Sequence, residues 1–144
     1  MELSKYQNSP QQFEVSGQNI VPYILSLSEY MQSRDINVMP YPTLIFSRDD
    51  EYATNPFGKT AYYDPERQEI VLYTAGRHIK DVLRSFAHEM IHHNQNLSGA
   101  LDSGDMGSLE DPNYAQNNKY LRKMEMDAYL RGNMAFRDWE SGMK

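Results

Sequence analysis

The residues His88-Glu89-Met90-Ile91-His92 have types and a spacing that suit metal chemistry. Side chains four residues apart lie on one face of an α-helix, so both imidazoles can reach a single metal ion. A carboxylate directly after the first histidine is offset around the helix, so it misses the ion and can reach a water molecule bound to it. This H-E-x-x-H pattern therefore predicts a metal centre with His88 and His92 as ligands and Glu89 beside them.

The spacing of apolar residues predicts that this pattern lies on a helix from about Ile79 to Asn96. At about 100° per residue, its large apolar residues share one side of the helix: Ile79, Val82, Leu83, Phe86 and Met90. His88 and His92 fall on the opposite side, and Glu89 falls between the two. A helix packed through its apolar side presents both histidines to a cleft. The alternative is a solvated helix face that carries two histidines by chance.

The last predicted helix, from about Ala115 to Trp139, has an apolar stripe that contains one carboxylate. The stripe consists of Leu121, Met124, Ala128, Gly132, Ala135, Phe136 and Trp139. Glu125 lies inside it, where a carboxylate loses water and costs free energy unless it is paired. The small residues Ala128 and Gly132 beside it allow this helix to approach the metal helix closely.

A catalytic zinc site needs a third protein ligand, and here that ligand must be a carboxylate. The chain has no Cys, and no His follows His93. Glu125 is the candidate, because a zinc ion is a suitable partner for a buried carboxylate. Asp127, the nearest rival, is predicted to point to the other side of the helix. The alternative for Glu125 is an ion pair with a buried Arg or Lys.

All four histidines of the chain lie between His78 and His93. His93 projects towards the edge of the apolar side of its helix, away from His88 and His92. We therefore expect His93 to pack against the core or to support a neighbouring group, and not to bind the metal.

The remaining elements predict an α+β fold, because strands precede the helices and do not alternate with them. A helix is expected over Ile20–Arg34 and a strand over Thr43–Phe46. The runs Thr60–Tyr63 and Glu69–Tyr73 flank Asp64–Gln68, whose turn chemistry predicts a hairpin.

Length and composition bound the class of protein. The chain has 144 residues, which predicts one domain over residues 1–144, with residues 1–18 as a loose N-terminal arm. It shows neither an apolar leader nor a run of about 18 apolar residues, so we expect no membrane segment and a cytoplasmic location. A net charge of −6 without a Lys/Arg cluster argues against nucleic acid as a partner.

The H-E-x-x-H pattern followed by Glu125-Met126-Asp127-Ala128-Tyr129 resembles the gluzincins, which are zinc metallopeptidases, and in size their small ImmA/IrrE-like members. The resemblance covers roughly residues 60–139. It implies a compact zincin-like domain: a small, mainly antiparallel sheet with an N-terminal helix, an active-site helix and a C-terminal third-ligand helix. His88, His92 and Glu125 would then bind one Zn²⁺, and Glu89 would be the general base for hydrolysis of a peptide or protein substrate.

One departure from the gluzincin pattern concerns Tyr129. Many gluzincins have Asp at this place, four residues after the ligand Glu, where it orients the first histidine ligand. A phenol can bind an imidazole or face the substrate, and Tyr129 joins Glu89 in the predicted catalytic set. Tyr114 and Tyr120 are alternative donors to the tetrahedral intermediate. The resemblance also implies that the strand Thr60–Tyr63 adds an extended peptide as a further strand.

These features together predict a small zinc-dependent endopeptidase. The alternative is a metallopeptidase-like binding or regulatory module in which the zinc is structural or lost. A third reading is a latent enzyme, whose site is covered by the loop Ser98–Pro112 or by the N-terminal arm. Glu89 favours the enzyme, because a purely structural site does not need a carboxylate beside its first ligand.

Overall fold

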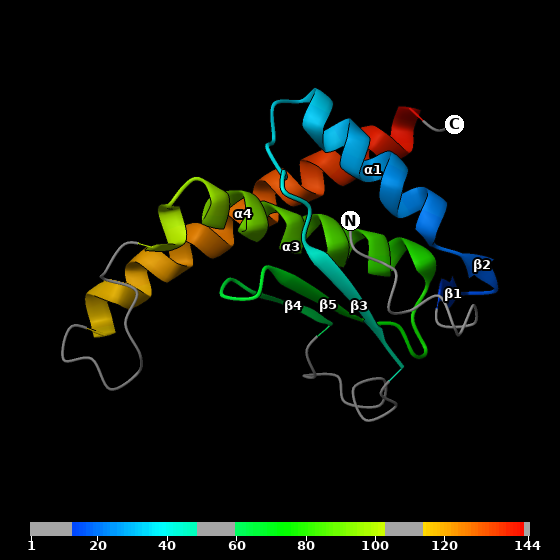
Figure 1. Cartoon of the computed structure of the whole chain (residues 1–144), viewed down its shortest axis with the longest axis horizontal. Helices are drawn as coiled ribbons and strands as arrows, with labels where there is room; N and C mark the ends of the chain where they lie inside the picture. Colours follow the sequence, from blue (N-terminus) through cyan, green and yellow to red (C-terminus); the bar gives the residue numbers. More distant parts are fainter. Residues whose placement is uncertain (1–12, 49–59, 103–113, 143–144) are drawn as a thin grey trace.

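The computed structural model describes residues 13–48, 60–102 and 114–142, with the backbone alone for residues 114–118. The helices in this part are α1 (Val21–Ser33), α3 (Ile79–Leu97), α4 (Tyr114–Gly142) and the short 3₁₀ helix η3 (Ala100–Asp102). The strands are β1 (Glu14–Val15), β2 (Gln18–Asn19), β3 (Thr43–Ser47), β4 (Ala61–Asp64) and β5 (Glu69–Tyr73), as Figure 1 shows.

This arrangement confirms the predicted α+β class, and the predicted helices and strands all form. The first helix and the metal helix agree with the expected ranges to within one residue at each end, whereas α4 continues past Trp139 to Gly142. The predicted loop over residues 98–112 contains η3 at its start, and residues 103–113 lie outside the described part. None of the described helices carries an apolar stretch long enough to cross a bilayer.

The sheet has the strand order β3-β5-β4. β5 is central and carries three consecutive buried residues, Ile70, Val71 and Leu72, as expected for a strand with neighbours on both sides. β4 and β5 form the predicted antiparallel hairpin, but β3 pairs with β5 in parallel. The prediction of a mainly antiparallel sheet is therefore wrong for this pairing, because alternating burial in β3 fixes its inward face and not its direction.

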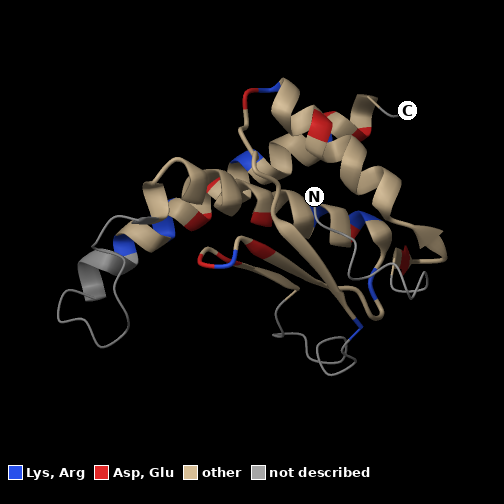
Figure 2. Cartoon of the chain, viewed as in Figure 1, with Lys and Arg blue, Asp and Glu red and all other residues tan. Residues whose placement is uncertain are grey.

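Helix α3 lies between the sheet on one side and the helices α1 and α4 on the other (Figure 1). Its apolar residues are buried as predicted, with Val82, Phe86 and Met90 fully covered. α4 joins α1 through the indole N–H of Trp139, which donates to the Ser26 hydroxyl at 2.9 Å. Basic and acidic residues are interspersed along the described helices and strands (Figure 2).

The first turn of α3 is held by side chains on both sides of the helix start. The Lys80 amide donates to His78 Nδ1 at 3.1 Å, and the Ile79 amide donates to Ser16 Oγ at 2.8 Å. Ser16 belongs to the turn between β1 and β2, and the neighbouring Val15 is buried in the core. The prediction of a loose arm is therefore wrong for residues 13–18, because this turn caps α3. Residues 1–12 lie outside the described part.

His93 connects α3 to both flanks of the sheet. Its ring is fully buried, with Nδ1 2.7 Å from the Tyr63 hydroxyl on β4 and Nε2 2.7 Å from the carbonyl oxygen of Pro40 ahead of β3. The Pro40 carbonyl can only accept, so Nε2–H donates to it, and Nδ1 of the neutral ring accepts from the Tyr63 hydroxyl, which itself accepts from Asn96. The predicted packing role of His93 is confirmed, and burial lowers the pKa of its ring.

We expect His93 to make the fold sensitive to acid. Its folded pKa lies below the ordinary value of 6.5, so the unfolded chain binds the proton first as pH falls. Stability is then lost below pH 6.5, by up to about 1.4 kcal/mol per pH unit. Urea unfolding between pH 7.5 and 5.5, with a chelator present, should show a steeper loss for the wild type than for His93→Phe. Equal slopes would contradict this role.

Candidate metal centre

The three predicted metal ligands lie together between α3 and α4. His92 Nε2 lies 2.5 Å from Glu125 Oε1, and His88 Nε2 lies 3.4 Å from Glu125 Oε2. One ligand atom from each of the three residues can be chosen so that all lie within 4.8 Å of one another. Two elements far apart in sequence thus bring two imidazole nitrogens and one carboxylate to a single point.

The surroundings of Glu125 differ from the prediction. Its side chain is 64% exposed, whereas His88 and His92 are 27% and 12% exposed. The expectation of a desolvated carboxylate is wrong because this part of α4 borders an open cavity and is not covered by core side chains. The alternative pairing with a buried Arg or Lys is not what the structure shows, since both oxygens of Glu125 face histidines.

The close approach of α4 to α3 depends on small residues, as predicted. Ala128 is fully buried, and Gly132 lies directly against the backbone of His88. A Cβ atom on Gly132 would lie 3.0 Å from both Cα and N of His88. This contact sets the separation of the two helices beside the first histidine.

Contacts among the candidate ligands shift the pKa values of Glu125 and His92. Hydrogen bonds from His88 and His92 hold the pKa of Glu125 far below its usual range. Burial acts to lower the pKa of His92, but hydrogen bonds with Glu125 and Gln95 and the negative charge of Glu89 outweigh it, so that pKa is raised. A metal ligand needs the Nε2 nitrogen without its proton, so metal binding at this site would weaken as pH falls.

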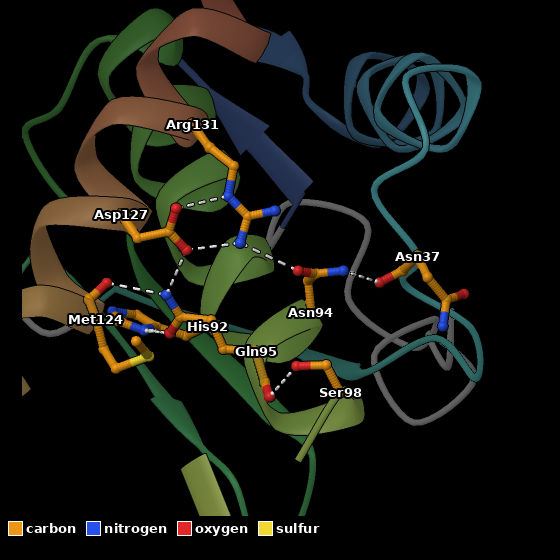
Figure 3. A network of polar contacts seen from close by, with 8 residues as sticks. All are labelled: Asn37, His92, Asn94, Gln95, Ser98, Met124, Asp127 and Arg131. Atoms are coloured by element: carbon orange, nitrogen blue, oxygen red, sulfur yellow. Dashed lines mark hydrogen bonds and ion pairs between the residues drawn. The ribbon is translucent and has the colours of Figure 1, made fainter. Parts of the chain in front are cut away.

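A polar network behind His92 was not predicted from the sequence (Figure 3). The Gln95 oxygen lies 2.8 Å from His92 Nδ1, and the Gln95 amide nitrogen donates to Asp127 Oδ2 at 2.9 Å. Asp127 in turn accepts two hydrogen bonds from Arg131, at 2.8 and 2.6 Å, which lower its pKa. Asp127 is not one of the three grouped ligands, because its carboxylate bonds Gln95 and Arg131. The spacing His92–Gln95, one helical turn, is the sequence signal that could have indicated this contact.

An open cavity of about 1040 Å³ lies over the candidate ligands. Residues of β4, α3 and α4 line it, among them Ala61, His88, Glu89, Glu125 and Tyr129. Glu89 is 6% exposed, so this carboxylate sits in a largely water-excluded wall beside both histidines. The predicted general base is therefore close to the predicted ligands and borders the same space.

The three candidate tyrosines have different positions. Tyr129 lines the cavity and is 59% exposed. Tyr120 donates its hydroxyl to the Ala100 carbonyl. The side chain of Tyr114 lies outside the described part. Of the two tyrosines whose side chains are described, Tyr129 is the one that reaches the cavity.

Arg77 links the residue ahead of β4 and the end of β5 to helix α3. Its guanidinium donates to the carbonyls of Thr60 and Tyr73 at 3.1 and 3.0 Å, and to the carbonyl of Asp81 and the hydroxyl of Ser85 on α3. Burial lowers the pKa of this guanidinium. This clamp holds the wall of the cavity that faces α4.

Two imidazole nitrogens and one carboxylate oxygen form a donor set that zinc takes in catalytic sites. Metal–ligand distances of about 2.0–2.2 Å place such atoms roughly 3–4 Å apart, which is close to the observed grouping within 4.8 Å. The residues present thus fit a zinc ion. Comparisons with protein-family models, with curated proteins and with solved structures found no match for this chain.

We expect Gly132→Ala to force α3 and α4 apart. The new Cβ meets backbone atoms of Ala87 and His88, which cannot rotate away. Overpacking of this kind costs about 1–3 kcal/mol, partly offset by about 1 kcal/mol of helix propensity. The free energy of unfolding in chelator should fall by about 1 kcal/mol. The matched control is Gly142→Ala on the same helix, where a Cβ meets nothing within 4 Å. Equal stability of the two variants would contradict the close contact.

Proposed function

We propose that this protein is a zinc-dependent peptidase that hydrolyses peptide bonds with water. The observation that carries this proposal is the convergence of His88, His92 and Glu125 on one point, within 4.8 Å, at the wall of an open cavity. The buried Glu89 beside them adds the proton acceptor that hydrolysis needs. The resemblance of the H-E-x-x-H pattern and the later Glu to gluzincins supports the same reaction class.

His88, His92 and Glu125 are the residues that would hold the ion. When bound, zinc supplies Lewis acidity and lowers the pKa of a coordinated water towards 7. Glu89 accepts the proton of the attacking water and then donates it to the leaving amine. Tyr129, on the α4 side of the cavity, is the proposed donor to the oxygen that gains negative charge.

Substrate binding is proposed along the edge strand β4. Among the described strands, the order β3-β5-β4 puts β4 at an edge of the sheet, and Ala61 and its neighbours line the cavity above the candidate ligands. An extended peptide paired with this edge runs past His88 and Glu89.

We expect the purified protein to contain one zinc ion per chain, and Glu125→Ala to lose or weaken it. Two imidazoles alone are an incomplete set for a protein zinc site. Elemental analysis of metal content after dialysis measures this directly. Glu29→Ala, which removes an exposed carboxylate from α1, serves as the matched control and should keep the metal. Absence of zinc from the wild type after incubation with Zn²⁺ would overturn the proposal.

We expect Glu89→Gln to retain zinc and to lose peptidase activity by about 10²- to 10⁴-fold, the range for removal of a general base. The substitution keeps the shape of the buried side chain and removes its ability to take a proton. Cleavage of quenched fluorescent peptides, measured beside metal content, separates the two effects. Unchanged turnover would remove Glu89 from this role. Metal binding without cleavage in the wild type would instead favour a binding module.

A further inference from the structure

Gln95 contacts both helices that carry the candidate ligands. It lies on α3, one turn after His92, and its side chain reaches across to α4 (Figure 3). Its amide nitrogen donates to the carbonyl oxygen of Met124 at 2.9 Å and to Asp127 Oδ2 at 2.9 Å. Met124 directly precedes Glu125, so Gln95 holds α4 at the residue next to the third ligand.

The orientation of the Gln95 amide follows from its partners. Met124 offers a carbonyl oxygen and Asp127 a carboxylate oxygen, and both can only accept. The NH₂ group must therefore face α4, since a flipped amide would set three oxygens against one another. Gln95 is 2% exposed, so water cannot replace these bonds.

The fixed amide determines which nitrogen of His92 carries a proton. The Gln95 oxygen lies 2.8 Å from His92 Nδ1 and can only accept, so Nδ1 is the donor. Nε2 faces the Glu125 carboxylate, to which it donates in the metal-free protein. A metal ion bound here would take the place of that Nε2 proton while Nδ1 stays bonded to Gln95, which is the arrangement that a histidine ligand needs.

Asp127 is itself held in place. Two hydrogen bonds from Arg131 fix its carboxylate, and Arg131 also donates to Asn94 Oδ1 at 3.2 Å. The Asn94 amide donates to the carbonyl of Asn37 at 2.9 Å, which ties the network to the segment ahead of β3. Gln95 is thus anchored in a frame built from three separate segments of the chain.

We infer that Gln95 is a positioning residue for the candidate metal centre, which fixes His92 with its proton on Nδ1 and holds α4 so that Glu125 faces both histidines. The part of this inference that concerns metal affinity rests on the proposed zinc site. The part that concerns the His92 proton applies to the metal-free protein as well.

The test compares the wild type with Gln95→Met, which keeps the length of the side chain and removes its polar atoms. Gln32→Met on α1 is the matched control, because Gln32 also loses a side-chain hydrogen bond, to Tyr41, and does not line the cavity. The first measurement is ¹⁵N NMR of the His92 ring in metal-free protein, which reports whether Nδ1 carries a proton and how fast that proton exchanges with water.

In the wild type and in Gln32→Met we expect a proton on Nδ1 that exchanges slowly with water, because it is bonded to the buried Gln95 oxygen. In Gln95→Met this acceptor is gone while Nε2 keeps the Glu125 carboxylate, so we expect the Nδ1 proton to exchange rapidly or to be absent. A wild-type ring without a proton on Nδ1, or an Nδ1 proton equally protected in Gln95→Met, would overturn the inference. The wild-type spectrum alone decides this point if Gln95→Met does not fold.

The second measurement is Zn²⁺ affinity by competition with a chromophoric chelator, with the visible spectrum of the Co²⁺-substituted protein. Removing a group that orients a histidine ligand typically costs 10- to 100-fold in metal affinity. We expect a loss of that size and a changed Co²⁺ spectrum in Gln95→Met, and neither change in Gln32→Met. Zinc bound equally by all three proteins would overturn the positioning role. Absence of zinc binding by the wild type would instead overturn the proposed function, whatever the NMR result.

Discussion

The contact between Gly132 and the backbone of His88 is the constraint on which the candidate site depends. Because Gly132 has a hydrogen atom in place of a side chain, α4 lies close to α3 at this point. Glu125 can therefore reach the imidazoles of His88 and His92. The sheet and α1 support this pair by packing on α3 and α4 respectively. The site is therefore a property of how two helices dock, and neither helix contains it alone.

Adjacent histidines on α3 show how strongly position on a helix controls chemistry. His92 borders the cavity, where carboxylates and the Gln95 oxygen raise its pKa. His93, rotated by about 100°, is buried, and its pKa is lowered. One residue favours the charged ring and the next favours the neutral ring, although both have the same side chain. The first is suited to exchange a proton for a metal ion, and the second to hold a strand in place.

The sequence was sufficient for those parts of the molecule that local spacing controls. The helical period placed His88 and His92 on one face, and the apolar stripes identified both packing surfaces. Elimination of other ligands led to Glu125, but its exposure depends on where α4 passes the cavity edge. The parallel pairing of β3 and the capping of α3 by Ser16 also depend on long-range contacts. Neither leaves a periodic signal in the sequence, so neither was predicted.

The candidate ligands lie on helices α3 and α4, and not on the segment that connects these two helices. His92 and Glu125 are joined through residues 98–113, yet the docking of α3 on α4 rests on contacts made by the helices themselves, such as Ala128, Gly132 and Gln95. The entropic cost of closing such a connection grows slowly, by only about 0.6 kcal/mol for each doubling of its length. Insertions and deletions in this connection are therefore tolerated far better than any change at the helix contact.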